Sequence, residues 1–445
     1  MSASRHSRFI DPLYGEITPT GIIGDLLMQP EMQRLRDVRL SNINSLTLTG
    51  CAGISRFEHS LGTAYLAAHT ANRMRLGKRD ATILVAAALL HDIGITPFGH
   101  LMEEAFRYAG TPFNHEQRLG DIFTGNAEFG GVHYQIFRGR EIGARSVLGR
   151  REWAELGLTL QDVFQVIRGE TALGELINGT VDLDNIDNVC RMAYHIGLRF
   201  RPELPISVAS GFFVEQGRLC FDEEQVEALS EWIDLRRRLY RVLMTNVDDF
   251  AAKAMMVEAI RRAIVGSDHV APVLKEGAWR LTDTELQHQL GEYGPSRDLM
   301  DRLVRGDLYH LVGMFWVEAP ESPFDLFSPE RSSLHREGLA DALGTTVCDT
   351  LVYMIKDKRV RKVDNLCVGR RGAVGSAALR IFGSSSRLVL FGVAVDREPT
   401  LGSRADARVA AYLGNVSGAE VYPCRVDSYQ EEIEGPNYDA QLALL

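Results

Sequence analysis

Apolar residues in the first three hundred positions recur mainly three and four residues apart, which is the spacing of amphipathic helices. The stretch 79–92 is apolar on nearly all sides and predicts a helix buried at the centre of a bundle. A short strand is expected at 46–49. Further helices are predicted at 60–76, 100–106, 158–169, 174–197 and 223–265, and one more is expected to start near His115. This part of the chain is therefore expected to be all-α.

The pattern changes beyond about residue 318. Residues 320–327 form a turn-rich, linker-like stretch, and 335–344 predict a short helix. Residues 350–364 and 386–396 alternate or run apolar in the manner of strands. We therefore predict a mainly α fold with two domains: a helical domain over 1–317 and a small C-terminal α+β lobe over 318–445.

Composition narrows the class of protein. The chain is 45% hydrophobic and 24% charged, as expected for a globular protein, and it has no run of 18 apolar residues and no apolar N-terminal signal. We therefore expect a cytoplasmic protein that does not cross a membrane. Its six cysteines form no CxxC pair, which argues against a zinc ribbon or a disulfide framework. A net charge of −10 disfavours a broad nucleic-acid-binding surface.

One pair of residues suggests chemistry. His91 and Asp92 end the apolar stretch, and His59 lies upstream at the expected start of another helix. Imidazoles and carboxylates held by rigid helices are suitable ligands for a divalent transition metal. A His-Asp pair also arises by chance, but a buried Asp92 needs a compensating cation. The fourth ligand would come from the acidic stretch 181–187, as Asp182, Asp184 or Asp187.

Four segments then resemble the successive motifs of one family. These are RFEHSLGTAYLA (56–67), LLHDIGITPFGH (89–100), NHE (114–116) and VDLDNID (181–187), and DPLYG (11–15) and QRLR (33–36) match as well. They are similar to HD-domain metal-dependent phosphohydrolases, in particular the deoxynucleoside triphosphate triphosphohydrolase branch, over roughly two thirds of the chain. The resemblance implies an HD-type helical bundle, a divalent cation (Mn, Fe, Ni, Co, Mg or Zn) and a homo-oligomer. The implied metal ligands are His59, His91, Asp92 and Asp184.

The same resemblance implies a catalytic neighbourhood. His115 and His100 would protonate a leaving oxygen or orient water, Glu116 would hold the imidazole of His115, and Arg56 would face a substrate phosphate. Simpler roles are open for two of them. His100 could cap its helix, and Arg56 could pair with Glu58 or Asp92.

Several positions depart from the family pattern. Ile95 stands where that branch has a second histidine, and Met28 stands in place of an aspartate of its nucleotide sensor. Asn185, Asn188 and Met192 replace a phosphate-binding lysine and two sugar-reading residues. Metal chemistry with a rewritten pocket is therefore expected. Replacement cations would come from Arg191, Arg199, Arg201 or the arginines of 138–151.

Three functions follow. The first is a metal-dependent phosphohydrolase that acts on a nucleotide or a related phosphate ester. The second keeps the chemistry but uses two metals to cleave phosphodiesters, with His100 and His115 as added ligands. The third is a catalytically degenerate HD protein that binds a nucleotide. The expected partner is a small-molecule phosphate substrate in each case, with nucleic acid as a substrate only in the second.

Overall fold

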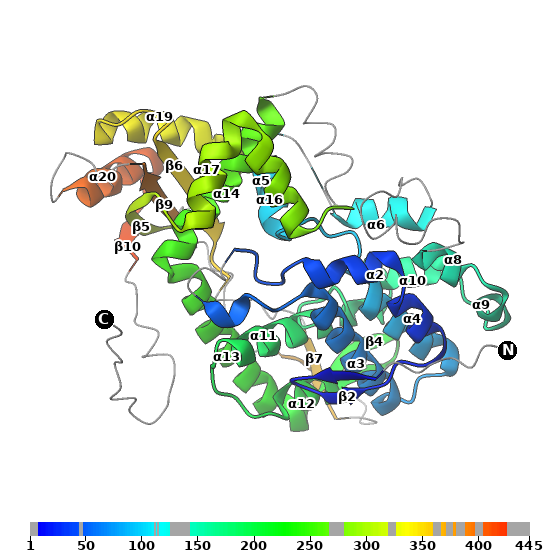
Figure 1. The fold of residues 1–445 in the computed structure, drawn as a ribbon. Coiled ribbons are helices and arrows are strands. Elements are labelled where there is room, and N and C mark those ends of the chain that lie inside the picture. The colour runs from blue at the N-terminus through cyan, green and yellow to red at the C-terminus, as the bar shows by residue number, and fades with distance from the viewer. Residues whose placement is uncertain are drawn as a thin grey trace, which may run out of the picture.

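The computed structural model describes residues 8–43, 48–110, 113, 115–124, 143–266, 280–318, 326–358, 366–370, 377–379, 388–396 and 404–424. For 116, 117, 152 and 377–379 it describes the backbone only. The described chain is mainly helical with small sheets, so the predicted fold class is confirmed (Figure 1).

A helical body makes up most of the molecule. Its helices are α1 (Gly21–Leu27), α2 (Pro30–Arg34), α3 (Arg56–Arg73), α4 (Lys78–Leu90), α5 (His100–Tyr108), α6 (His115–Thr124), α8 (Ala144–Leu148), α9 (Arg151–Glu155), α10 (Leu160–Ile167), α11 (Leu183–His195), α12 (Leu204–Ser210), α13 (Val226–Thr245), α14 (Val247–Val265), α16 (Asp283–Glu292) and α17 (Gly294–Arg305). The apolar stretch 79–92 forms α4, whose C-terminal half is fully buried, as its pattern predicts. The strand expected at 46–49 is wrong where the structure describes it, because Thr49–Cys51 is a 3₁₀ turn.

The strands form three small sheets. β1 (Phe9–Asp11) and β2 (Gly15–Ile17) make a hairpin. A second sheet has the order β10-β5-β9-β6, from Val421–Pro423, His310–Glu318, Leu388–Val395 and Thr350–Lys356. The third has the order β3-β4-β7-β8, from Phe212–Glu215, Arg218–Asp222, Leu366–Gly369 and Ala377–Leu379. The last two sheets both combine strands from before and after residue 318, the boundary expected between the two domains.

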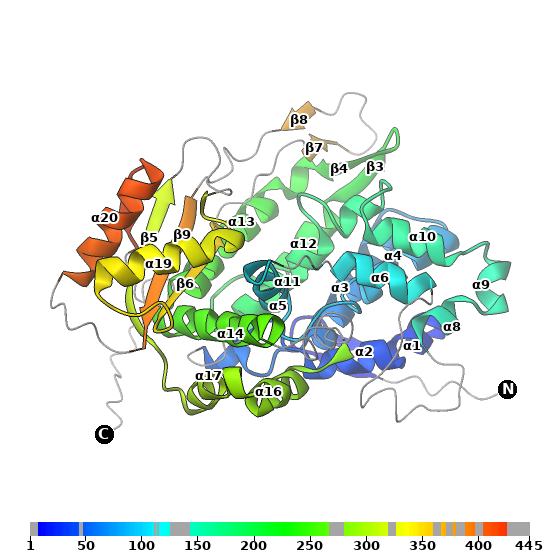
Figure 2. The ribbon, with the colours of Figure 1, turned by 90° about the horizontal axis from the view of Figure 1, so that it is seen from above.

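The four-stranded sheet that contains β6 is covered on both faces. α19 (Ser332–Leu343) and α20 (Ala405–Ser417) lie on one side of it, and α14 of the helical body lies on the other (Figure 2). Close approach of α14 depends on Gly392 in β9, because a Cβ there would lie 2.1 Å from Cε1 of Phe250. The C-terminal segment is thus packed directly on a central helix of the body.

Two clusters of buried apolar side chains form the interior. One is centred on α3, α4 and α10 to α13, and the other joins α5, α14, α16 and α17 to the sheet that contains β6. Tyr240 of α13 packs against both clusters. The cavity described next lies at this junction, because residues of both halves line it.

Candidate metal centre and active-site cavity

The first turn of α3 supplies two buried polar side chains. Ser55 caps this helix, because its side chain accepts a hydrogen bond from the Glu58 backbone N–H at 3.2 Å. Arg56 and His59 are three residues apart and so share one face, and they are 5% and 1% exposed. The cap fixes the start of α3, and the helix then carries both side chains into the interior.

His91 lies at the C-cap of α4 with a fixed ring orientation. Its Nδ1–H donates to the backbone oxygen of Ala88 at 2.8 Å, and a carbonyl can only accept. In the neutral ring, Nε2 therefore carries the lone pair. This buried nitrogen has no hydrogen-bond partner among the described residues. A bare, buried imidazole nitrogen of this kind is suited to bind a cation.

The acidic stretch 181–187 divides its carboxylates between three tasks. Asp182 is the N-cap of α11 and accepts from the Asn185 backbone N–H at 2.7 Å and from its Nδ2 at 2.8 Å. Asp187 points to the rear of His59. Asp184 faces the histidines, with Oδ1 2.9 Å from Nε2 of His59 and 3.6 Å from Nε2 of His91. Of the three aspartates, the geometry therefore favours Asp184 as the ligand.

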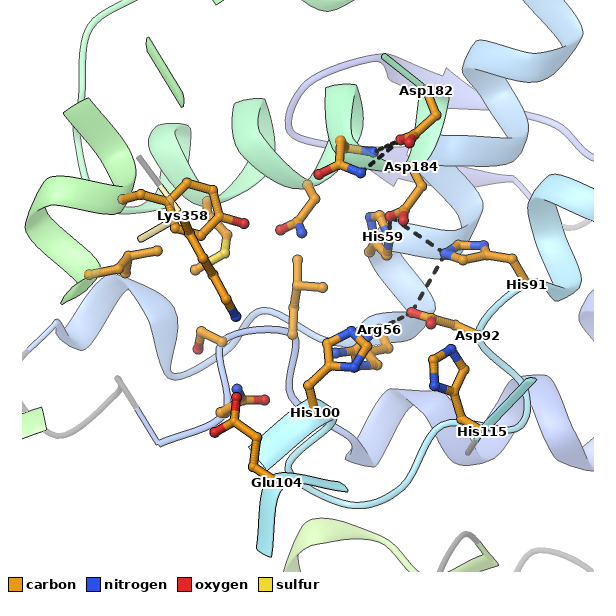
Figure 3. Close-up of a pocket in the computed structure, with 18 of the residues that line it drawn as sticks. Arg56, His59, His91, Asp92, His100, Glu104, His115, Asp182, Asp184 and Lys358 are labelled. Carbon is orange, nitrogen blue, oxygen red and sulfur yellow. Dashed lines mark hydrogen bonds and ion pairs between the residues drawn. The ribbon is translucent and has the colours of Figure 1, made fainter. Parts of the chain in front are cut away.

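His59, His91 and Asp184 form a compact group of donors. One ligand atom from each lies within 4.8 Å of the other two (Figure 3). Asp92 is adjacent: its Oδ2 lies 3.7 Å from Nε2 of His91 and 2.6 Å from a guanidinium nitrogen of Arg56. Of the two partners considered for Arg56, the structure pairs it with Asp92 rather than Glu58. The four ligands implied by the sequence are thus brought to one place, with Asp92 in an ion pair.

A buried network behind His59 orients its ring. Asp187 Oδ2 accepts from His59 Nδ1 at 2.7 Å, and its Oδ1 accepts from the Tyr14 hydroxyl at 2.8 Å. Arg191 donates to both oxygens at 2.9 Å. Gly62 leaves the space for this pair, since a Cβ there would lie 2.2 Å from each partner. Carboxylates that hold a histidine in this way fix its tautomer and increase its strength as a ligand.

Sequence reasoning did not assign this supporting role to Asp187, or any role to Tyr14. The signals were present in the sequence. Asp187 and Arg191 have the i, i+4 spacing of a helical ion pair, and Tyr14 lies in the DPLYG motif. Arg191 is fully buried in this network, and Arg199 and Arg201 are exposed. None of the three lines the cavity, so they do not supply the expected phosphate contacts.

The electrostatics of the three donors favour a bound cation. Burial alone would lower the pKa of His59, but hydrogen bonds to Asp184 and Asp187 raise it to about 9. Burial would raise the pKa of Asp184, but His59 and His91 hold it well below its usual range. The Asp184 carboxylate is thus ionised. Nε2 of His59 and Nε2 of His91 lie 2.9 and 3.6 Å from its Oδ1, so all three groups face the position that a cation would take. Nitrogen and oxygen donors of this kind fit Mn, Fe, Co, Ni or Zn.

A second cluster joins the two other histidines. Glu103 accepts from Nδ1 of His100 at 2.8 Å and from Nδ1 of His115 at 2.7 Å. Burial would raise the pKa of Glu103, but these two bonds lower it to about 2. The sequence predicted Glu116 as the partner of His115. That side chain is outside the described residues. The carboxylate that holds His115 is Glu103, whose Oε1 also accepts from the His115 backbone N–H at 3.1 Å.

The donors open into a cavity of about 260 Å³. Its wall combines the metal-ligand group, His100 and His115 with residues of α11, α13, α14 and β6. The lining beyond the histidines includes Asn42, Glu104, Asn185, Asn188, Met192, Tyr240, Lys253, Tyr353 and Lys358. Of the five positions that depart from the family pattern, Asn185, Asn188 and Met192 therefore face the site, whereas Ile95 and Met28 do not line the cavity.

Comparison with known protein families matches residues 56–192 to the HD domain. That range contains every histidine and aspartate of the two clusters. Residues 56–192 are an HD domain. HD domains bind divalent metal, and His59, His91 and Asp184 provide a possible metal site here.

Three relatives are similar to this chain over 269 to 350 residues. The deoxynucleoside triphosphate triphosphohydrolase SAMHD1 of Danio rerio is 25% identical over 350 residues, 68% of this chain and 55% of its own length. Human SAMHD1 is 24% identical over 279 residues, 57% of this chain and 44% of its own. The uncharacterized protein YwfO of Bacillus subtilis is 24% identical over 269 residues, which are 58% of this chain and 56% of its own length. The chain spans about half the length of these curated relatives.

Within the described ranges, no helix is both long and apolar enough to cross a membrane.

Proposed function

We propose that this HD protein is a metal-dependent phosphohydrolase that acts on a nucleotide or a related phosphate ester. The observation that carries the proposal is the convergence of His59, His91 and Asp184 around one point, where Nε2 of His91 faces two carboxylates and makes no hydrogen bond with a described residue. The HD-domain match and the names of the SAMHD1 relatives support the same reaction class. A dNTP-like substrate is the finer version of this proposal.

His59, His91, Asp184 and Asp92 would hold the ion. When bound, a divalent ion supplies the positive charge that stabilises phosphate oxygens and makes water a better nucleophile. For Asp92 to join the ligands, its carboxylate would share its charge between the ion and Arg56. Arg56 is buried beside the donors, and its Nε has no hydrogen-bond partner among the described residues. Its guanidinium would then be available to bind a phosphate oxygen.

His115 and His100 would move the proton. Glu103 accepts from Nδ1 of both rings, which leaves each Nε2 to face away from that carboxylate. An imidazole held in this manner can donate from Nε2 to a leaving oxygen while the carboxylate stabilises the positive ring. His115 is the less exposed of the two, with 23% of its side chain accessible against 52% for His100. We therefore assign the proton to His115 and positioning to His100.

The direct test uses purified full-length protein reconstituted with Mn, Fe, Ni, Co, Mg or Zn. Each metal form is assayed against nucleoside mono-, di- and triphosphates by phosphate release and product analysis. We expect turnover with at least one metal, and loss of metal binding and turnover in His91→Ala. His115→Ala should keep the metal and lose about 10²- to 10⁴-fold in rate, as for loss of a general acid. Absence of turnover with every metal would refute the proposal.

A two-metal phosphodiesterase is the second candidate, and one observation favours it. His100, Glu103 and His115 also bring one ligand atom each within 4.8 Å of one another, so a second ion could bind there. Elemental analysis separates the two functions. One ion per chain supports the phosphohydrolase, and two ions with cleavage of cyclic nucleotides or single-stranded nucleic acid support the diesterase. Saturable nucleotide binding without turnover, unchanged in His115→Ala, would instead support a degenerate HD protein.

Ligand roles, the domain division at 317/318, a cytoplasmic location and a homo-oligomer all stay predictions.

A further inference from the structure

The wall of the cavity that faces the metal donors carries two lysines. Lys358 follows β6, and Lys253 lies on α14. Figure 3 shows the Lys358 side chain reaching into the cavity from the side opposite His91. Tyr353 and Ile355, both on β6, line the same wall. The C-terminal part of the chain therefore builds one side of the proposed active site.

Lys358 is held in place through its backbone. The guanidinium of Arg236, on α13, donates to the Lys358 carbonyl oxygen. The same guanidinium lies over the ring of Tyr240, 4.5 Å from its centroid, and Tyr240 also lines the cavity. The segment 357–358 after β6 is thus fixed against the helical body, and the lysine side chain extends from an anchored backbone.

The ammonium group of Lys358 makes no ion pair and no hydrogen bond with any described residue, although the side chain is partly buried. Lys253 lines the same cavity, is 7% exposed, and donates from Nζ to the Leu243 carbonyl oxygen at 3.3 Å. Burial lowers the pKa of Lys253, the neighbouring charge of Lys358 lowers it further, and Asp249 and Glu104 oppose this. Glu104 lines the cavity, where its carboxylate accepts from the Tyr353 hydroxyl at 2.5 Å.

A cation that faces a cavity without a protein partner is suited to bind an anion from the ligand. Lysine in particular binds phosphate as a compact point charge. The position that follows Asp184 cannot do this here, because Asn185 carries no charge and its Nδ2 donates to Asp182. Positive charge in the cavity away from Arg56 comes instead from Lys253 of α14 and from Lys358, two residues after β6.

We propose that Lys358, supported by Lys253, binds a second phosphate group of the substrate while the first lies at the metal donors. This rests on the proposed function and narrows it to substrates with at least two phosphates. The second phosphate could belong to the same phosphoanhydride chain, as in a nucleoside triphosphate, or to the sugar, as in a nucleoside 3′,5′-bisphosphate. The chemistry at the lysines is the same in both.

The test compares Lys358→Gln, Lys358→Arg and, as a control, Lys78→Gln, which removes an exposed lysine at the start of α4. Metal-reconstituted protein is assayed with a nucleoside monophosphate, a triphosphate and a 3′,5′-bisphosphate. Loss of one charge-assisted contact predicts a fall of about 10- to 100-fold in kcat/KM for Lys358→Gln. That fall should affect one of the two polyphosphorylated substrates and spare the monophosphate, and the substrate affected identifies the source. Lys358→Arg should recover most of the activity.

A second arm requires no turnover. Chelator-treated protein is titrated with inorganic triphosphate by calorimetry, with unfolding temperatures as a check that each variant folds. Wild type and Lys78→Gln should bind alike, and Lys358→Gln should bind about tenfold or more weakly. If wild type turns over nothing, the proposed function fails and this arm still decides the role of the lysine. Equal triphosphate binding by wild type and Lys358→Gln, or no binding by either, would overturn the proposal.

Discussion

Asp187→Asn tests whether the buried network behind His59 strengthens the metal site. Asp187 accepts four hydrogen bonds, from His59, from Tyr14 and two from Arg191. An amide has one oxygen, so the variant must give up the two bonds at one of the former oxygens. If the amide nitrogen replaces Oδ2, His59 loses the acceptor that fixes Nε2 as the ligand atom. Removal of such a partner costs about 10- to 100-fold in metal affinity, or about 1.4 to 2.8 kcal/mol.

The variant should still fold. Arg191 is fully buried, but it also pairs with Asp11 at 2.9 Å and Glu58 at 2.6 Å. The loss of stability should therefore stay below the about 3 to 5 kcal/mol that follows when a buried charge loses its only partner. Glu58→Gln is the matched control, because it also removes one carboxylate from Arg191. The Glu58 side chain is hydrogen-bonded to Arg191 and His195 and not to the His59 ring.

The assay is a Mn²⁺ titration of metal-free protein, followed by urea unfolding of the same samples. We expect a weaker Kd for Asp187→Asn and an unchanged Kd for Glu58→Gln, with moderate destabilisation of both. Equal Kd values for Asp187→Asn and wild type would refute the orienting role of Asp187. An equal loss in both variants would assign the effect to Arg191 and to general stability.

Three further outcomes are expected. The pKa of His59 is raised to about 9 in the metal-free fold, so the folded protein holds a proton there at neutral pH. A metal ion must displace this proton. Metal affinity should therefore increase as pH rises toward 9. Calorimetry in two buffers of different protonation enthalpy should show about one proton released, and identical heats would contradict this. Asn188 has a buried Oδ1 with no hydrogen-bond partner among the described residues. Asn188→Leu should therefore raise the free energy of unfolding by about 1 kcal/mol, measured by urea unfolding, and lower nucleotide affinity, measured by KM. A loss of stability in this variant would contradict the prediction. Gly392→Ala places a Cβ 2.1 Å from Phe250 and should destabilise the protein by about 1 to 3 kcal/mol. Gly414→Ala in α20 is the control, because its Cβ meets no atom within 4 Å and should not destabilise the protein. Thermal unfolding of both variants measures the difference.

The helical body was predictable because its signals are local. The apolar stretch of α4 and the Gly and Pro that follow His91 define a buried helix and its end from sequence alone. The strand expected at 46–49 was wrong for the opposite reason. Its short apolar pattern does not distinguish a strand from an irregular turn, and tertiary packing decides which forms.

The metal donors were also predictable, since each lies beside a helix boundary and the motifs occur in a characteristic order. Their partners were not. Glu103 reaches His115 across twelve residues, and Lys358 reaches the cavity from more than 170 residues beyond Asp184. No periodicity connects such positions, because the loop between α5 and α6 and the packing of β6 on α14 set their approach. The sequence pattern thus predicts the metal site and the proposed reaction class, and long-range packing determines the shape of the cavity beside it.

The residues after 317 belong to the site as much as to a separate lobe. β5 ends at Glu318 and pairs with β9, and β4 of the helical body pairs in parallel with β7. These pairings hold β6 against α14, and β6 in turn places Tyr353 in the cavity and leads to Lys358. A chain that ended at 317 would keep the metal donors but leave β5 unpaired and one wall of the cavity missing. In the function proposed above, metal binding and substrate recognition would therefore be carried by different parts of the chain, so the metal motif could persist while the pocket around it changes.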